Sequence, residues 1–186
     1  KTAEEINDGT FSKYLYMPIT FPVFIFFRSL AERTIYFISA ILEVTFFILI
    51  VKANLFIQIN FIYLMYFIIS LILAYFIYFV MSFSFNLLSF WSREAHGPIF
   101  LFTWISEFTS GEFYPLNILS PVFFSFLSIL PFAYLLFYPI MIYFGKVSGY
   151  EIIKIMCLQL FWIALFSVLA AFIWKKGLRK YSGEGI

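Results

Sequence analysis

Two long stretches without a charged side chain constrain this sequence more than any other feature. Lys52 and Arg93 enclose 40 residues, and Glu112 and Lys146 enclose 33, with no Asp, Glu, Lys or Arg in either interval. A membrane-spanning helix needs about 20 apolar residues, so each interval exceeds one span. Over the whole chain 63% of residues are apolar and only 12% are charged. So few polar side chains cannot cover a soluble surface, and the sequence predicts a polytopic membrane protein.

Helices are predicted for the spans, because barrel strands alternate apolar and polar side chains. The run Phe46–Ile50 is apolar throughout and does not alternate. The predicted fold class is therefore all-α, a transmembrane helical bundle of about four full spans. Within a transmembrane domain of residues 34–175, the predicted spans are 34–52, 57–83, 90–111 and 151–174.

The second uncharged interval predicts a different structure, because prolines interrupt it three times. Proline stops or kinks a helix, so one straight span over 117–144 is not expected. Two short re-entrant helices that enter and leave the same face fit better, provided that protein covers their backbone. The residues predicted to form these turns are Gly111, Pro115, Pro121 and Pro131.

The basic side chains predict the orientation. Nine of the twelve Lys and Arg lie in the N-terminal segment 1–33, in the patch 89–97, and at the end of the last span, where Lys175 precedes the tail 176–186. Four spans connect these regions on one side, which predicts that both ends are cytoplasmic. The segment 1–33 is expected to be a cytoplasmic coupling and interfacial segment. Its part 11–27 is expected to form a short helix and elbow at the membrane surface, with Arg28 and Arg33 at the headgroups.

Two acidic residues lie in the predicted spans and are candidates for a translocation path. Glu43 stands near the middle of its span, where a charge costs about 2.5–3.5 kcal/mol on insertion scales. It could line an aqueous path, or it could be a protonated or hydrogen-bonded carboxyl that fixes helix packing. Glu107 could mark the outer mouth of a path, but the nearby end of the span favours a position at the headgroups.

Other residues that suggest chemistry have simpler interpretations. Arg93, Glu94 and His96 are expected to be interfacial charges of a cytoplasmic loop. One histidine and Cys157 are too few and too distant in sequence for a metal site, and a single cysteine allows no disulfide within the chain. The 29 phenylalanines are expected mainly to face lipid and fill the bundle, and not to form an aromatic drug pocket.

Several short motifs occur along the chain in a fixed order. They are Ile6–Phe11, Tyr14–Ile19, Ser89–Trp91, Ser110–Leu116, Leu130–Tyr134, Gly145 and Trp174–Tyr181. Their order resembles that of the permeases of bacterial type-2 ABC exporters, in the small six-span branch related to viologen and drug exporters, and the resemblance covers nearly the whole chain. That branch has two spans before this point, and the chain starts at Lys1, so two further spans are expected upstream.

The resemblance implies a permease subunit of the cell membrane that is not itself an enzyme. A second permease chain, identical or different, would complete the substrate path among the membrane lipids, and a separate ATPase subunit would bind ATP. The sequence agrees, because it contains no Gly-x-x-x-x-Gly-Lys-Ser/Thr phosphate loop. No cofactor, metal, catalytic residue or nucleic acid is expected. The residues implied to couple to the ATPase are Asn7, Gly9, Phe11, Tyr14 and Leu15.

Two other functions are considered. A polytopic lipid-modifying enzyme would need His, Asp or Glu side chains that converge at one depth, and this chain has few of them. A structural membrane subunit without transport activity is not separated from a permease by the sequence, because nothing in it identifies a substrate.

Overall fold

The computed structural model describes residues 2–52, 56–92 and 96–181, except for the side chains of Leu15 and His96. Every regular element in these residues is a helix, which confirms the all-α class. Among the described residues, three helices are long and apolar enough to cross a membrane. A bent helix pair, Pro121–Ile129 with Pro131–Tyr143, would be a fourth crossing if the two helices together form one span. The chain divides into two compact units, which are described separately: unit 1 is Lys1–Gly9 with Gln58–Ile186, and unit 2 is Thr10–Ile57.

Unit 2 contains the short helix α2 (Ser12–Leu15) and the long helix α3 (Phe21–Val51). The 31 residues of α3 extend over about 46 Å, so this helix includes the predicted span 34–52 and begins 13 residues before it. The helix is continuous from Phe21, so residues 21–27 of the predicted short helix and elbow belong to α3. Pro22 explains the difference, because it stands in the first turn of α3, where its missing N–H costs no helical hydrogen bond.

Unit 1 is built on α4 (Phe61–Leu87), which continues into the single 3₁₀ turn η1 (Leu88–Phe90). After it come α5 (His96–Ser110) and, at the end of the chain, α8 (Gly149–Lys180). The short helix α1 (Thr2–Asn7) also belongs to this unit. The helix α5 has 15 residues and covers residues 96–110 of the predicted span 90–111.

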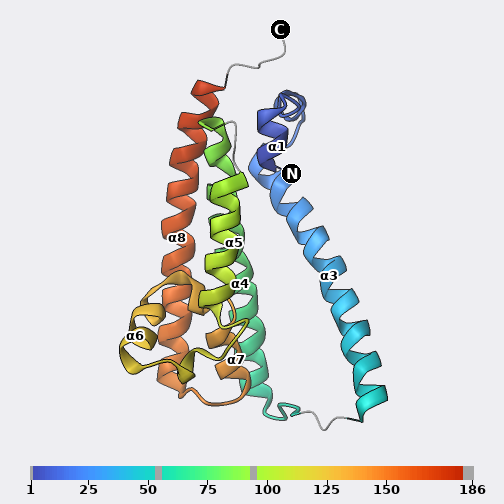
Figure 1. Cartoon of the computed structure of the whole chain (residues 1–186), viewed down its shortest axis with the longest axis vertical. Coiled ribbons are helices and arrows are strands. Elements are labelled where there is room, and N and C mark those ends of the chain that lie inside the picture. Colours follow the sequence, from blue (N-terminus) through green and yellow to red (C-terminus); the bar gives the residue numbers. More distant parts are fainter. Residues whose placement is uncertain (1, 53–55, 93–95, 182–186) are drawn as a thin grey trace. The chain divides into compact units, whose positions relative to one another are not determined.

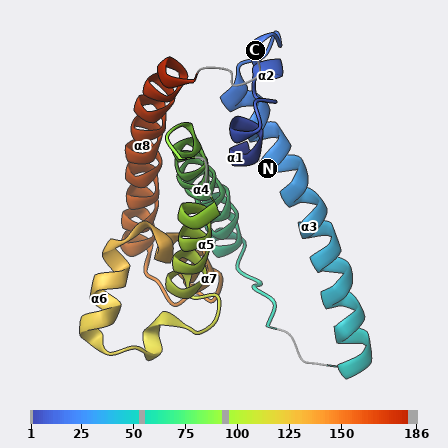
Figure 2. The same ribbon diagram turned by 45° about the horizontal axis from the view of Figure 1, so that its top comes forward.

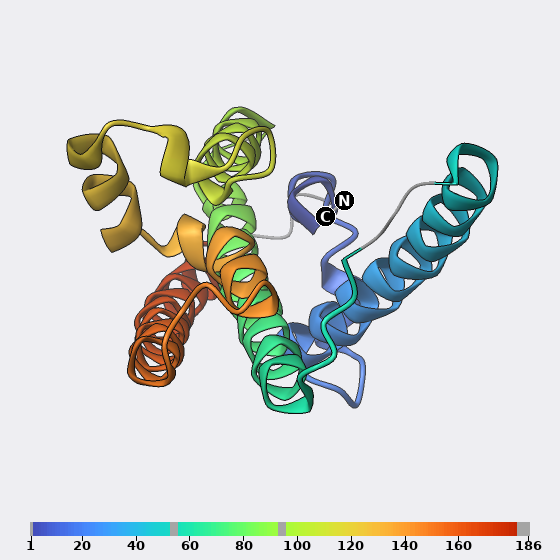
Figure 3. The same cartoon turned by 90° about the horizontal axis from the view of Figure 1, so that it is seen from below.

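The core of unit 1 lies around α4, which packs against α5, α7 and α8 (Figure 3). The face of α4 toward α8 repeats at helical spacing and begins with two small residues, Ser70 and Ala74. Small side chains let membrane helices approach closely. On α8 the buried side chains follow the same spacing, at Ile152, Ile155 and Gln159.

A polar network is buried where these two helices meet. Gln159 has no exposed surface, and its Nε2 donates to the Ser70 carbonyl at 3.0 Å and to the Tyr134 carbonyl at 3.1 Å. The Ser70 hydroxyl in turn donates to Gln159 Oε1 at 3.2 Å. One side chain of α8 is thus bonded both to α4 and to the segment between α5 and α8.

That segment consists of η2 (Leu116–Ile118), α6 (Pro121–Ile129), η3 (Pro131–Tyr134) and α7 (Phe137–Tyr143). The chain bends by 78° between α6 and the helical run from Pro131 to Tyr143. The helix α5 ends, and α8 begins, at the same end of unit 1 (Figures 1 and 2). The intervening segment therefore leaves and returns at one end, as predicted for a re-entrant pair, and does not cross the unit.

Candidate functional site

The other end of unit 1 brings together three parts of the chain that are far apart in sequence. The helix α1 packs against η1 and α4, and its Ala3 and Ile6 are buried. The Tyr181 hydroxyl, just after α8, donates to the Gly9 carbonyl at 3.2 Å. We call this arrangement of α1, η1 and the C-terminal end of α8 the terminal junction. It connects the N-terminal segment to two of the helices that are long enough to span a membrane.

An aromatic cluster without space for rearrangement holds the terminal junction together. The Phe90 ring lies 6.0 Å from the rings of both Trp174 and Tyr181, measured between centroids. It also lies directly on Gly177, where an added Cβ would be 2.8 Å from Phe90 Cγ and 2.9 Å from Cε2. Only glycine at this position allows the ring to pack against the α8 backbone.

The predicted coupling residues divide between the two units. Asn7 ends α1 and is exposed, and Gly9 accepts the bond from Tyr181, so both belong to the terminal junction. Phe11 and Tyr14 are instead buried in unit 2. Their rings lie 4.8 and 5.2 Å from the Phe21 ring, so they pack α2 against α3. The Leu15 side chain lies outside the described residues.

The surface of this segment is formed by residues that the sequence analysis did not select. The side chain of Tyr16 is 90% exposed, and Met17 and Ile19 beside it are also exposed. Pro18 holds this turn between α2 and α3. In the sequence, a proline flanked by apolar and aromatic side chains between two helices could have indicated this exposed surface. We call Tyr16–Ile19 the exposed turn.

The two acidic candidates lie in different units. Glu43 is exposed on α3. No residue in the most apolar 18-residue stretch of this helix is buried. Ser39, one turn earlier, is exposed as well. Glu107 is half-buried near the end of α5, where its carbonyl accepts a 3.4 Å bond from the Ser110 hydroxyl. The loop charges Arg93 and Glu94 lie outside the described residues.

The predicted turn residues occupy the positions where the re-entrant segment changes direction. Gly111 follows α5 with a φ of +92°, and a Cβ there would lie 3.3 Å from Phe137 Cβ. Pro115 immediately precedes η2, while Pro121 begins α6 and Pro131 begins η3. Both of these prolines stand in the first turn of a helix, the position that tolerates them best.

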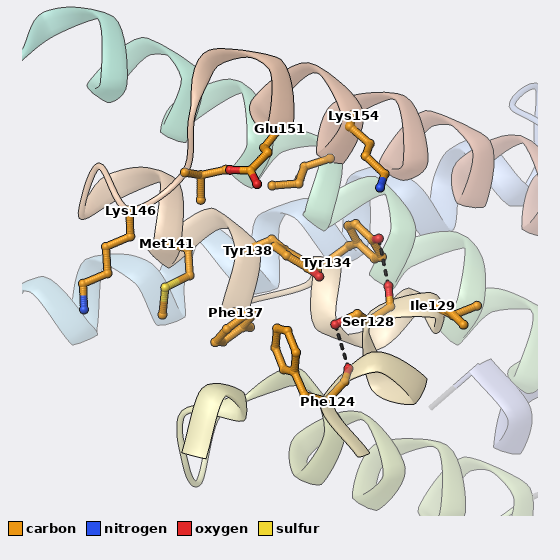
Figure 4. Close-up of a pocket in the computed structure, with 12 residues that line it drawn as sticks. Phe124, Ser128, Ile129, Tyr134, Phe137, Tyr138, Met141, Lys146, Glu151 and Lys154 are labelled. Carbon is orange, nitrogen blue, oxygen red and sulfur yellow. Dashed lines mark hydrogen bonds between the residues drawn. The ribbon is translucent and has the colours of Figure 1, made fainter. Parts of the chain in front are cut away.

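Two cavities lie beside this segment, and the sequence analysis did not anticipate them. The larger, of about 460 Å³, lies between α6, α7 and the first turns of α8. Figure 4 shows its aromatic wall of Phe124, Phe137, Tyr134 and Tyr138, with Lys154 extending toward it from α8. The Tyr134 hydroxyl donates to the Ser128 carbonyl at 2.9 Å and fixes one edge. The smaller cavity, of about 280 Å³, lies between Gly111, η2 and α7.

A metal-binding site was sought among the His, Cys, Asp and Glu side chains that the structure describes. No three His, Cys, Asp or Glu side chains in the described ranges could hold one ion. The geometry thus consists of a helical bundle, a terminal junction at one end and a re-entrant segment with cavities at the other.

Comparison with known proteins agrees with this architecture. Neither a curated protein nor a solved structure matches the chain. A family described as ABC-2 family transporter protein matches residues 1–185. The match includes the three long helices, the re-entrant segment and all three parts of the terminal junction. The chain therefore belongs to the ABC-2 transporter family, as a membrane permease component.

Proposed function

We propose that the chain is the permease subunit of an ABC exporter, driven by a separate ATPase subunit and completed by a second permease chain. The observation that carries this proposal is the terminal junction. The N-terminal segment is bonded to the end of α8 through Tyr181 and Gly9, and packed on α4 through α1 and η1. A displacement of residues 2–9 would therefore reach both α4 and α8 through direct contacts.

The exposed turn is the proposed contact with the ATPase. Helices that transmit a conformational change act as rigid bodies between packed arrangements, and the aromatic contacts of Phe11 and Tyr14 with Phe21 make such a body of α2 and the start of α3. Closure of two ATPase subunits would move the exposed turn, and α3 would follow. On this proposal both chain ends are cytoplasmic, in the cell membrane.

Glu43 is the proposed contact of the substrate path. A carboxyl near the middle of a membrane span needs a polar neighbour or water, and Glu43 is exposed on α3. A substrate path shared with a second permease chain would place water or polar groups beside the Glu43 carboxyl. Glu107 is proposed to lie nearer the headgroups, because α5 ends only three residues after it.

Tyr16→Ala is expected to weaken ATPase binding while the permease remains folded. Truncation of a central interface tyrosine typically costs about 2 kcal/mol, which is roughly thirtyfold in Kd. The measurement is co-purification and titration of the ATPase encoded beside this chain, with ATP hydrolysis recorded in the complex. Tyr150→Ala is the matched control, because Tyr150 is 80% exposed in the first turn of α8. Equal ATPase binding by both variants would contradict the coupling role.

Glu43→Gln is expected to leave membrane levels unchanged and to reduce export of a transported dye or drug. Glutamine keeps the size and hydrogen-bonding capacity of the side chain but removes its charge. A packing role predicts that glutamine is tolerated, so normal export by this variant would argue against a place in the path. Ser39→Ala, one turn away on α3, controls for general disturbance of the helix. ATPase stimulation without export of any tested compound would favour a structural subunit.

A further inference from the structure

The two cavities beside the re-entrant segment share a wall and a cation. Phe137, Met141 and Lys146 line both of them. The larger cavity lies on the α6 and α8 side of this wall and the smaller on the side of Gly111 and η2. Together they form two apolar compartments that meet at one lysine. Their volumes, about 460 and 280 Å³, are near or within the range of small-molecule sites.

The backbone around Lys146 is fixed by two successive helix caps. At the end of α7, Gly145 has a φ of +65°, its N–H donates to the Ile142 carbonyl, and the Lys146 N–H donates to the Met141 carbonyl. This is the Schellman pattern of helix ends. Two residues later Ser148 starts α8 in a capping box with Glu151. The shared lysine therefore starts from a rigid position, with its ammonium 5.8 Å from the centre of the Phe144 ring.

The charges at the cavities favour an anion. Among the described lining residues, Lys146, Lys154 and Glu151 carry a formal charge. The Glu151 carboxylate is already engaged, because the Ser148 N–H and hydroxyl both donate to its Oε2, at 3.0 and 3.2 Å. Lys154 borders only the larger cavity. The two ammonium groups thus leave a net positive rim around an aromatic interior.

We infer that the paired cavities bind an anionic phospholipid with two acyl chains, one on each side of the wall formed by Phe137 and Met141. The phosphate would lie at Lys146, with Lys154 as the second cation. An ammonium group attracts a phosphate most strongly where little water surrounds them, and this rim lies at the end of unit 1 where α8 begins, opposite the terminal junction. The inference does not depend on export or on an ATPase.

The surroundings of the cavities favour a lipid over a water-soluble anion. The helix α6 borders the larger cavity and protrudes from the bundle (Figure 2), with Val122, Phe123 and Phe126 exposed. Such an exposed apolar surface on α6 is unsuited to water and favours contact with lipid. A free phosphate would contact the lysines but would leave both apolar compartments unfilled.

The test is binding to the full chain purified in a neutral detergent, measured by native mass spectrometry. The probes are dioleoylphosphatidylglycerol, dioleoylphosphatidylcholine, single-chain oleoyl-lysophosphatidylglycerol and inorganic phosphate. We expect the phosphatidylglycerol to bind most tightly and inorganic phosphate not to displace it. Lys146→Gln should weaken its binding about fivefold, the effect of one lysine at a headgroup. Lys176→Gln, near the opposite end of α8, should leave it unchanged.

A second variant tests the apolar compartments. Met141→Trp would fill space on both sides of the shared wall and should abolish retention of the phosphatidylglycerol, with thermal unfolding as the check of its fold. If Met141→Trp proves unstable, Lys154→Gln tests independently whether the positively charged rim contributes to lipid binding. Equal binding of phosphatidylcholine, tighter binding of the single-chain lipid, displacement by phosphate, or wild-type affinity in both lysine variants would overturn the inference.

Discussion

Replacing Gln159 by leucine is expected to destabilise the membrane bundle by about 2 kcal/mol, although the two side chains have similar volumes. Hydrogen bonds between membrane helices are individually weak, at about 0.6 kcal/mol on average. This substitution also removes the donor that reaches the Ser70 and Tyr134 carbonyls and the acceptor for the Ser70 hydroxyl. A buried polar group that loses its partner costs about 1–3 kcal/mol, so the loss exceeds that of one bond.

The effect should be largest in the re-entrant segment. The bond to the Tyr134 carbonyl is the polar contact of α8 with η3, so amide hydrogen exchange over 131–143 is expected to increase more than exchange over the middle of α4. Thermal or denaturant unfolding of the purified chain in detergent gives the stability change. Leu160→Ala is the control, because Leu160 is the next residue on α8 and is exposed. Gln159→Leu unfolding at the wild-type midpoint would show that the network contributes nothing.

Gly177→Ala is expected to destabilise the terminal junction by about 2 kcal/mol through one added methyl group. Over-filling a packed core typically costs about 1–3 kcal/mol, and the new Cβ would lie 2.8 Å from Phe90 Cγ. The ring cannot move freely, because Trp174 and Tyr181 flank it. If the junction transmits force from an ATPase, ATP hydrolysis in the complex should also become less dependent on the transported compound.

A double-mutant cycle separates this clash from a general effect on α8. Phe90→Ala alone should destabilise the junction, because the large ring leaves a cavity. The same change should accommodate the methyl group, so Gly177→Ala should cost little in the Phe90→Ala background. Residues in direct contact show such coupling, whereas distant pairs add.

Gly149→Ala is the matched control on the same helix. A Cβ at Gly149 meets nothing within 4 Å, and alanine favours a helix over glycine by up to about 1 kcal/mol. This variant should be as stable as the wild type or more so. Additive effects of Gly177→Ala and Phe90→Ala would indicate that the ring does not pack on Gly177 in the membrane.

Local and compositional features determined a large part of this protein. The long uncharged intervals require a nonaqueous environment, since hydrocarbon is the only solvent in which so much apolar surface is stable. The prolines within 117–144 were enough to predict a broken segment, because the ring removes a donor wherever it stands. The same rule does not interrupt α3, because a proline in the first turn of a helix does no harm and Pro22 occupies that position.

Only the tertiary structure decided which residues meet. The family resemblance implied that Phe11 and Tyr14 couple to the ATPase; both are buried, whereas Tyr16, two residues later, is exposed. Gln159 gave no signal among its apolar neighbours, and its partners Ser70 and Tyr134 lie 89 and 25 positions away. Lys146 became a shared cation of two cavities only because two caps hold it beside the wall of Phe137 and Met141. Periodicity and composition indicate whether each helix is surrounded by water or by lipid. Contacts between helices depend instead on side-chain shape and hydrogen-bond geometry across the bundle.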